Sequence, residues 1–357
     1  MTAVPVAISV RPDRAGATET APEPRAMPTS GPLVDPFGRV HDDLRISVTD
    51  RCNLRCTYCM PDEGMTFLPR SMLLSFDEIV RVATVARALG VTSVRLTGGE
   101  PLVRRGLPEL VSRLADVGLD DLALTTNGVL LAEQAQALAD AGLDRVNVSC
   151  DSLRAERFGT IRRRGDLSTV LRSMDAAEAA GLSPVKVNVV LLRGHNDGEV
   201  LDFAAFARDT GRPVRFIEYM PLDADGAWAR DQLVPGDEVL RRIEARWPLE
   251  PVATDPGPAP ARSFRFADGH GEIGLISSVT QPFCGTCNRL RLTADGAIRN
   301  CLFSDDELDA RAVLRHRGTD DELALMLRRA VWGKHPGHGI NDPGFLRPAR
   351  SMSMIGG

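Results

Sequence analysis

Three cysteines lie close together in the stretch DRCNLRCTYCMPD, at Cys52, Cys56 and Cys59, which we call the first cysteine set. Their spacing, C-x3-C-x2-C, allows three thiolates to bind one inorganic centre. A structural zinc ion usually takes four protein ligands, whereas an iron–sulfur cube held by three thiolates keeps one iron open to a small molecule. The spacing therefore favours an open iron–sulfur cluster. Buried structural thiols, or a zinc site completed by a distant histidine, are the alternatives.

A second cysteine set lies near the end of the chain, at Cys284, Cys287 and Cys301, with the spacing C-x2-C-x13-C. This set also lacks a fourth cysteine. Two sets that are each one ligand short are difficult to reconcile with zinc fingers, so we expect two open clusters. The seventh cysteine, Cys150, ends a predicted strand, and we expect it to be a small buried residue because free cysteines are commonly buried.

Length, charge and composition limit the possible functions. The chain has 357 residues, 43% of them hydrophobic and 25% charged, with a net charge of -5. It is long enough to bury a substantial core, and it lacks the basic character of a nucleic-acid-binding protein. No apolar run reaches the roughly 18 residues that span a bilayer, and no signal peptide is evident. We therefore predict a cytoplasmic protein with no nucleic-acid or membrane partner, whose cysteines serve metal binding or catalysis.

Strand and helix patterns alternate through the middle of the chain. Short β-branched runs predict strands over residues 44–49, 92–97, 122–126, 145–150, 185–192 and 214–220. Amphipathic patterns between them predict helices that end on glycine, including 75–90, 131–142 and 167–181. The first of these helices opens with Ser75 and Glu78 at capping-box spacing. Such an alternation predicts parallel βαβ units.

Both a doubly wound open sheet and a barrel fit this alternation. Glycine-rich or polar segments follow nearly every predicted strand, for example TGGEP after 92–97 and TTNG at the end of 122–126. Chemistry at the C-terminal ends of the strands is typical of a barrel with one central site. We therefore predict an α/β fold, an incomplete (β/α)6 TIM-type barrel.

The sequence divides into three regions. Residues 1–36 contain seven prolines and few large apolar residues, which predicts a disordered extension. Residues 37–246 form the predicted barrel. In residues 247–357, short alternating runs and an ADG turn predict a small antiparallel β module that caps the barrel mouth and carries the second cysteine set.

Taken together, these motifs resemble the GTP 3′,8-cyclase family of the radical S-adenosylmethionine (SAM) superfamily. The resemblance is carried by LRISVTDRCNLRCTYCMP, RLTGGEPLVRR, NVSCDSL, RFIEYMP, FCGTCNRLRLT and the terminal IGG, and it extends from about residue 37 to the last glycine. It implies a lyase that converts GTP to (8S)-3′,8-cyclo-7,8-dihydroguanosine 5′-triphosphate, the first step of molybdenum cofactor biosynthesis.

The resemblance also assigns cofactors. It implies that each cysteine set binds one [4Fe–4S] cluster, and that the open iron of the first cluster binds SAM. Residues that would contact SAM are Tyr58, Gly99, Ser149 and Met220. Glycine suits position 99, because a backbone that approaches a ligand closely has no room for a side chain.

For the substrate, the resemblance implies a set of GTP-binding residues, mostly cations: Arg45, Arg95, Thr125, Lys186, Arg215, Arg289, Leu290 and Arg291. Without it, the arginines of NRLR would be interpreted as a solvated face, and strand alternation places both on one side. There is no glycine-rich phosphate loop, so phosphate recognition must depend on side chains. Catalytic roles are implied for Arg289, Arg291, Gly356 and Gly357, of which the two glycines would reach into the active site.

In the implied reaction, an electron from the reduced first cluster cleaves SAM to methionine and a 5′-deoxyadenosyl radical. That radical removes the hydrogen from C3′ of GTP, and the resulting carbon radical at C3′ attacks C8 of the guanine. Partners implied are an electron donor, a downstream cyclic pyranopterin monophosphate synthase and a second copy of the chain in a homodimer. The alternatives are a peptide-modifying radical SAM enzyme with an auxiliary cluster, a zinc module and a simple electron carrier. The carrier would need no substrate pocket.

Overall fold

A single curved sheet of twelve strands organises the computed structural model, which describes residues 26–252 and 258–356. The strand order is β12-β11-β10-β1-β2-β3-β4-β5-β6-β9-β8-β7. The strands are β1 Asp43–Ser47, β2 Ser93–Thr97, β3 Asp121–Thr126, β4 Arg145–Ser149, β5 Val185–Leu191, β6 Val214–Glu218, β7 Leu249–Pro251, β8 Arg262–Phe266, β9 Glu272–Ile276, β10 Arg289–Leu292, β11 Ala297–Arg299 and β12 Glu307–Asp309.

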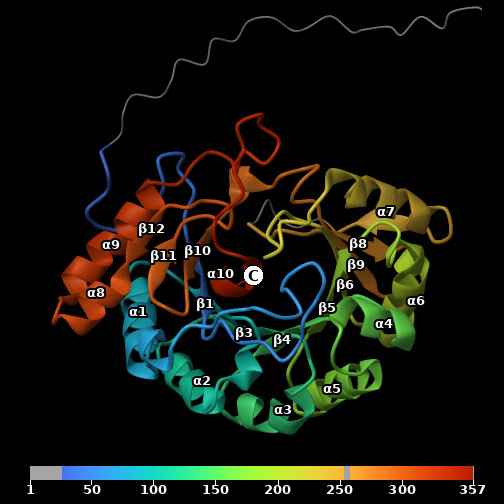
Figure 1. Cartoon of the computed structure of the whole chain (residues 1–357), viewed down its shortest axis with the longest axis horizontal. Helices are drawn as coiled ribbons and strands as arrows, with labels where there is room; N and C mark the ends of the chain where they lie inside the picture. Colours follow the sequence, from blue (N-terminus) through green and yellow to red (C-terminus); the bar gives the residue numbers. More distant parts are fainter. Residues whose placement is uncertain (1–25, 253–257, 357) are drawn as a thin grey trace, which may run out of the picture.

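Helices surround this sheet on its outer face (Figure 1). They are α1 Phe76–Ala88, α2 Leu107–Ala115, α3 Leu131–Asp140, α4 Ala155–Arg162, α5 Leu167–Ala179, α6 Val200–Thr210, α7 Gly236–Glu244, α8 Ala310–Arg315, α9 Asp320–Trp332 and α10 Met352–Ile355. The short α10 is the exception, because it lies inside the ring of strands (Figure 1).

The six predicted βα units are confirmed. Strands β1 to β6 pair in sequence order, and every one of these pairs is parallel. Helix α1 begins at the predicted cap, where Ser75 and Glu78 form a capping box. Within the described residues the sheet has two free ends, β12 and β7, so the barrel does not close.

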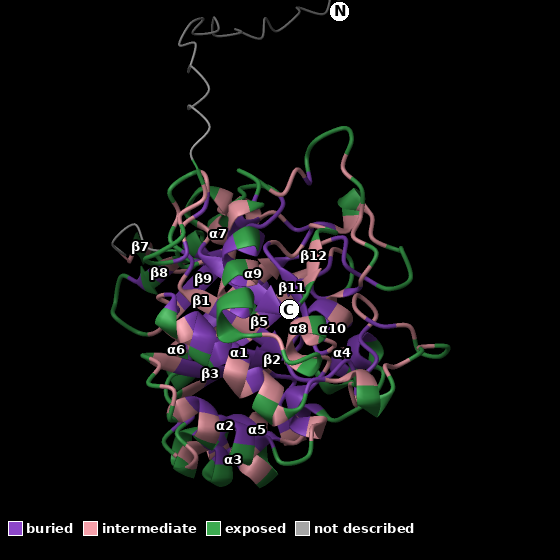
Figure 2. Cartoon of the chain, turned by 90° about the vertical axis from the view of Figure 1, so that its left-hand side faces the viewer, coloured by how far each residue is buried: buried purple, intermediate pink, exposed green. Residues whose placement is uncertain are grey.

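Alternation along the strands separates the core from the barrel interior. On β1, Leu44 and Ile46 are fully buried, and on β2 so are Val94 and Leu96. These residues belong to the hydrophobic core between the sheet and the helices. The residues between them therefore point the other way, into the barrel. Figure 2 shows the buried residues gathered along the strands and the inner sides of the helices.

The C-terminal strands differ from the predicted capping module. Strand β10 pairs in parallel with β1, and β9 pairs in parallel with β6. Antiparallel pairs then continue outward, from β10 to β11 and β12 and from β9 to β8 and β7. These strands therefore extend the barrel sheet at both edges. The physical reason is that β1 and β6 would otherwise expose unpaired backbone groups along their outer edges.

Part of the predicted extension belongs to the folded structure. Residues 1–25 lie outside the described residues, but Leu33 is fully buried and its amide donates to the carbonyl of Leu89 at 3.0 Å. Arg328 on α9 donates to the carbonyl of Gly31 at 2.6 Å. The prediction of disorder is therefore wrong for residues 31–36.

Across the described ranges, no helix combines the length and apolar character that a membrane crossing requires.

A buried carboxylate at the end of β6 provides a test of this architecture. Glu218 is 2% exposed and accepts hydrogen bonds from the amides of Gly236 at 3.0 Å, and of Val279 and Thr280 at 2.8 Å. Replacing it with glutamine turns one acceptor into a donor that faces other donors. We expect Glu218→Gln to lower the free energy of unfolding by about 1–3 kcal/mol.

Urea denaturation of both proteins measures this loss. The matched control is Glu133→Gln on the exposed side of α3, which should be nearly neutral. Equal stability of the Glu218 variant and the parent protein would contradict the assigned role of the carboxylate.

Candidate active site

A cavity inside the barrel brings the two cysteine sets together. Its walls come from the loop after β1, from the C-terminal ends of β2 to β6 and from the C-terminal part of the chain. All six predicted metal ligands line it, namely Cys52, Cys56, Cys59, Cys284, Cys287 and Cys301. Both sets therefore border one shared space, which is the arrangement that two clusters with a substrate between them require.

The first cysteine set lies in a tightly wound loop. The carbonyl of Cys56 accepts hydrogen bonds from the amides of Cys59 and Met60, both at 3.0 Å. The sulfur of Cys52 accepts from the amide of Leu54 at 3.4 Å. One backbone amide thus already points at the sulfur of Cys52, as amides do around thiolates that carry negative charge.

Three free thiols in each set fit the ligand set of an iron–sulfur cube that keeps one iron open. All the cysteines are free thiols. Among the described residues, no three His, Cys, Asp or Glu side chains are grouped closely enough to hold one metal ion. Zinc requires every sulfur at about 2.3 Å from one centre, whereas each thiolate of a cube binds its own iron and so can lie further from the others.

Burial and local charge affect the two sets differently. Burial raises the pKa of Cys52 to about 11 and also raises the pKa of Cys56. For Cys287 burial acts in the same direction, but the cations Arg289 and Lys334 outweigh it and lower the pKa to about 6. Because metal ligands must be deprotonated, assembling a cluster on the first set must release protons.

The TGGEP segment after β2 packs directly on the first cysteine loop. A Cβ atom on Gly99 would lie 2.5 Å from the carbonyl oxygen of Arg51 and 2.7 Å from that of Asp50. The amide of Gly99 donates to the carbonyl of Thr49 at 2.7 Å. Only glycine permits this approach, so position 99 fixes where the cysteine loop lies.

We expect Gly99→Ala to displace the cysteine loop, because the clashing atoms are backbone and cannot rotate away. After anaerobic reconstitution this variant should hold about four fewer irons than the parent protein. Gly198→Ala is the matched control, since a Cβ there meets nothing within 4 Å. Iron analysis decides the question, and full iron content in the Gly99 variant would refute the tight-packing argument.

A buried carboxylate ties two strand ends together beside the first cysteine set. Glu100 is 1% exposed and accepts hydrogen bonds from the hydroxyl of Thr126 and the amide of Asn127, both at 2.7 Å. Burial raises the pKa of Glu100 to about 7. The side chain of Asn127 in turn contacts the sulfur of Cys52 at 3.8 Å. The end of β3 is thereby held against the first cysteine loop.

The four residues predicted to contact SAM all line the cavity: Tyr58, Gly99, Ser149 and Met220. They come from the cysteine loop and from the ends of β2, β4 and β6. The hydroxyl of Tyr58 donates to Asp151 at 2.8 Å, which fixes the ring beside the first cysteine set.

Three arginines stand side by side across adjacent strands. Arg45 on β1 is in register with Arg291 on β10 and with Arg95 on β2. Burial lowers the pKa of Arg45 to about 9 and that of Arg95 to about 10. Within the described residues the buried Nε atoms of Arg45 and Arg95 have no hydrogen-bond partner. Half-buried cations whose buried Nε–H donors lack partners favour the binding of an anion at this place.

Of the eight residues predicted to bind GTP, six line the cavity: Arg45, Arg95, Thr125, Arg215, Arg289 and Arg291. Leu290 is fully buried in the hydrophobic core, on the opposite side of β10 from its two arginine neighbours. Lys186 on β5 is absent from the lining. Burial, and then the positive charge of Arg215, lower the pKa of Lys186 to about 8.

The end of the chain enters the barrel beside these arginines (Figure 1). Arg291 donates to the carbonyl of Gly356. A Cβ on Gly356 would lie 2.5 Å from the hydroxyl of Thr97 and 2.8 Å from Cβ of Ser47, and its φ is +81°. Glycine is therefore required by both space and conformation. Gly357 lies outside the described residues, so its predicted role stays a prediction.

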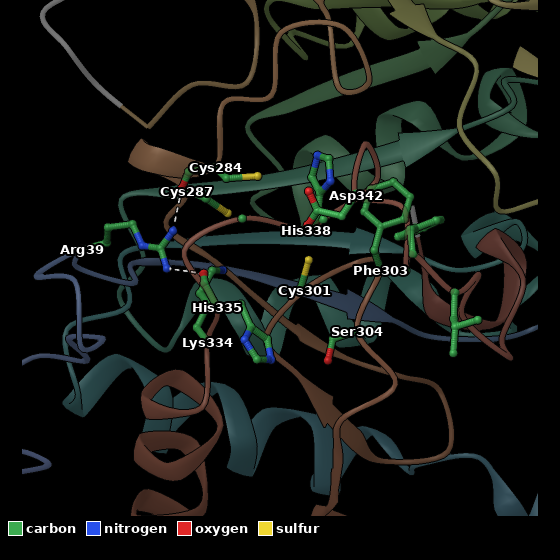
Figure 3. Close-up of a pocket in the computed structure, with 15 residues that line it drawn as sticks. Arg39, Cys284, Cys287, Cys301, Phe303, Ser304, Lys334, His335, His338 and Asp342 are labelled. Carbon is green, nitrogen blue, oxygen red and sulfur yellow. Dashed lines mark hydrogen bonds between the residues drawn. The ribbon is translucent and has the colours of Figure 1, made fainter. Parts of the chain in front are cut away.

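The second cysteine set also borders a second cavity, drawn in Figure 3. There Arg39 donates to the carbonyl of Cys284 at 2.6 Å and to that of His335 at 2.8 Å. From the other side, Lys334 donates to the carbonyl of Asn300 at 2.7 Å. Two cations thus hold the backbone around the second cysteine set.

Cys150, the cysteine that belongs to neither set, is fully buried, as predicted.

Several polar residues of the cavity were not singled out from the sequence, including Glu100, Asp151 and Arg162. Glu100 lies within TGGEP, and Asp151 follows a predicted strand, so the strand-end pattern could have identified both. Arg162 lies in the run IRRRG, which looks like a solvated helix end. Only the fold shows that it is buried.

The fold and the cysteine loop define a radical SAM protein. The family described as "Radical SAM superfamily" matches residues 46–207, and "Molybdenum Cofactor Synthesis C" matches residues 213–340. Among solved structures, Streptococcus suis SuiB bound to precursor peptide SuiA has a TM-score of 0.57 at 14% identity, covering 87% of this chain and 66% of that one. Native anSMEcpe with bound AdoMet has a TM-score of 0.52 at 16% identity, covering 84% and 82%. At this identity the likeness concerns the fold alone.

Curated relatives are much more similar. A GTP 3′,8-cyclase of Mycobacterium sp. strain KMS is 49% identical over 333 residues, covering 93% of this chain and 95% of the relative. GTP 3′,8-cyclase 2 of Mycobacterium tuberculosis is 50% identical over 341 residues, covering 94% and 95%. A GTP 3′,8-cyclase of Corynebacterium glutamicum is 48% identical, covering 91% and 89%. The chain belongs to the GTP 3′,8-cyclase family.

Proposed function

We propose that this protein converts GTP to (8S)-3′,8-cyclo-7,8-dihydroguanosine 5′-triphosphate, using SAM and two [4Fe–4S] clusters, as the first step of molybdenum cofactor biosynthesis. The observation that carries the proposal is the cavity bordered by both cysteine sets and by a row of three adjacent arginines. Family membership supports the reaction class, and the paired sets of three thiols support the two clusters.

In this proposal the first cysteine set would hold one [4Fe–4S] cluster together with SAM, and the second set would hold the other cluster. When bound, the first cluster would supply the electron for reductive cleavage of SAM, the chemistry that would let the hydrogen at C3′ of GTP be removed. The hydrogen bond from the amide of Gly99 to the carbonyl of Thr49 holds the start of the first cysteine loop against the end of β2. Tyr58, Ser149 and Met220 then orient SAM in the same cavity.

The chain's own cations bind and orient the substrate. Arg45 and Arg95 offer buried, unpaired Nε–H donors to the oxygens of the triphosphate. Arg291 is held by the carbonyl of Gly356, so its guanidinium has a fixed position when the nucleotide arrives. The tail at Gly356 fills space between the ends of β1 and β2 and so excludes water from this side of the site.

The product must be an isomer of GTP. One hydrogen atom leaves C3′, a bond forms between C3′ and C8, and one electron and one proton complete the product. This stoichiometry determines what an activity assay should detect. After anaerobic reconstitution of the protein, GTP should disappear only when SAM and a reductant are both present. The product should have the mass of GTP but a different chromatographic retention, and GTP deuterated at C3′ should give deuterated 5′-deoxyadenosine.

The same experiment separates the alternatives. Cleavage of SAM without any loss of GTP favours a peptide-modifying radical SAM enzyme, and two bound zinc ions in place of about eight irons favour a zinc module.

We also propose, from the family pathway, an electron donor, a downstream cyclic pyranopterin monophosphate synthase and a homodimer. Cytoplasmic location stays a prediction.

A further inference from the structure

A buried guanidinium lies beside the first cysteine set. Arg162, the last residue of α4, is 2% exposed and lines the active-site cavity. Its Nη1 donates to the sulfur of Cys56 at 3.4 Å, and its Nη2 lies 2.7 Å from a carboxylate oxygen of Asp151. Its Nε has no hydrogen-bond partner among the described residues. The cation is therefore placed against a sulfur and only partly neutralised by protein.

The carboxylate that pairs with Arg162 is shared among several donors. One oxygen of Asp151 also accepts the hydroxyl of Tyr58 at 2.8 Å, and the other accepts the amide of Val190 at 2.9 Å. Asp151 is 1% exposed, so water does not screen the pair. Burying two charges is costly unless both are hydrogen-bonded and held in good geometry. The site therefore retains a cation where an apolar side chain would avoid that cost.

The end of α4 explains why a cation is useful at this position. Its terminal carbonyls, on Ile161 and Arg162, accept the amides of Thr57 and Arg55 at 3.0 and 3.2 Å. The helix thus anchors the first cysteine loop with its C-terminus. That end carries a partial negative charge, which disfavours adding an electron nearby. The guanidinium of Arg162 lies on the same side and has the opposite sign.

We infer that Arg162 is a positioning residue that raises the reduction potential of the cluster on the first cysteine set; this inference rests on the proposed function. Reduction adds one negative charge to the cluster. A nearby cation and a hydrogen bond to a ligating sulfur both stabilise the reduced form, and hydrogen bonds to sulfur are an established determinant of cluster potentials. The neutral amide of Asn127, at 3.8 Å from the sulfur of Cys52, is a weaker version of the same contact.

The test is a redox titration of the reconstituted protein, followed by electron paramagnetic resonance, on the parent and on Arg162→Met. Methionine keeps much of the side-chain volume but removes the charge. We expect about a tenfold lower ratio of reduced to oxidised first cluster at a given potential, which equals a shift of about 59 mV to more negative values. The potential of the second cluster should stay unchanged, which provides an internal reference.

Arg164→Met is the matched control, because Arg164 follows two residues after Arg162, beyond the end of α4, with a side chain that is 49% exposed. Arg162→Lys keeps the charge but loses the forked geometry, so a smaller shift in the same direction is expected, and this variant carries the test if methionine prevents folding. An unchanged potential in a variant with full iron content overturns the inference. Absence of any iron–sulfur signal in the parent protein overturns the proposed function as well.

Discussion

Replacing Arg291 with methionine should lower the rate of GTP consumption by about 10²–10³-fold while SAM cleavage continues. Arg291 is 6% exposed, and its guanidinium lies between the substrate cavity and the carbonyl of Gly356. Removing one preoriented donor from a site that excludes water costs about 2.7–4 kcal/mol of transition-state stabilisation. The two cysteine sets are not changed, so the iron content should equal that of the parent protein.

This variant also separates a substrate role from a structural one. Burial, and then the charges of Arg45 and Arg289, lower the pKa of Arg291 to about 9, so the folded protein holds this cation against repulsion. Methionine relieves that repulsion, and thermal stability should not fall. Arg172→Met, on the exposed side of α5, is the control and should keep full activity. Wild-type turnover by the Arg291 variant would contradict its placement in the substrate site.

Replacing Cys301 with serine should abolish GTP turnover, because it removes one of only three thiolates of the second cysteine set. The iron content should fall from about eight to about four per chain, the number that one remaining [4Fe–4S] cluster accounts for. Reductive cleavage of SAM should persist, because it depends on the first cysteine set, which this substitution leaves intact.

Cys150→Ser provides the matched control for this experiment. Cys150 is fully buried, and it does not line the cavity that both cysteine sets border. The same chemical change should therefore leave about eight irons and normal turnover. Iron analysis and product chromatography on both variants decide the point. Eight irons in the Cys301 variant would mean that this residue is no cluster ligand.

The barrel was predictable because local sequence pattern determines it. The run around Arg45 alternates polar and apolar residues, so it specifies both a strand and the face that the arginine occupies. The partners of the C-terminal strands were not predictable in this way. Nothing within residues 289–292 indicates that this strand pairs in parallel with β1, because pairing depends on which sheet edge is free.

The site was predictable where motifs with fixed spacing occur. The two cysteine sets could be identified from their spacing and TGGEP from its place after a predicted strand, and the fold brings all of them to one cavity. Leu33 could not be recognised as buried, because the prolines around it resemble those of an unstructured segment. Arg162 looked like a surface charge in a run of three arginines, and only the packing of α4 on the cysteine loop reveals its burial.

The pairing of β1 with β10 has a consequence for how the chain folds during its synthesis. Asp42 and Asn288, which join these two strands at one end, are 246 residues apart. Until the ribosome has released β10, the outer edge of β1 stays uncovered, and the thiols that follow it lack their complete enclosure. Such late, non-local contacts slow folding and leave intermediates open to aggregation. Newly made chains should therefore be most vulnerable to oxygen and to self-association before this last segment emerges.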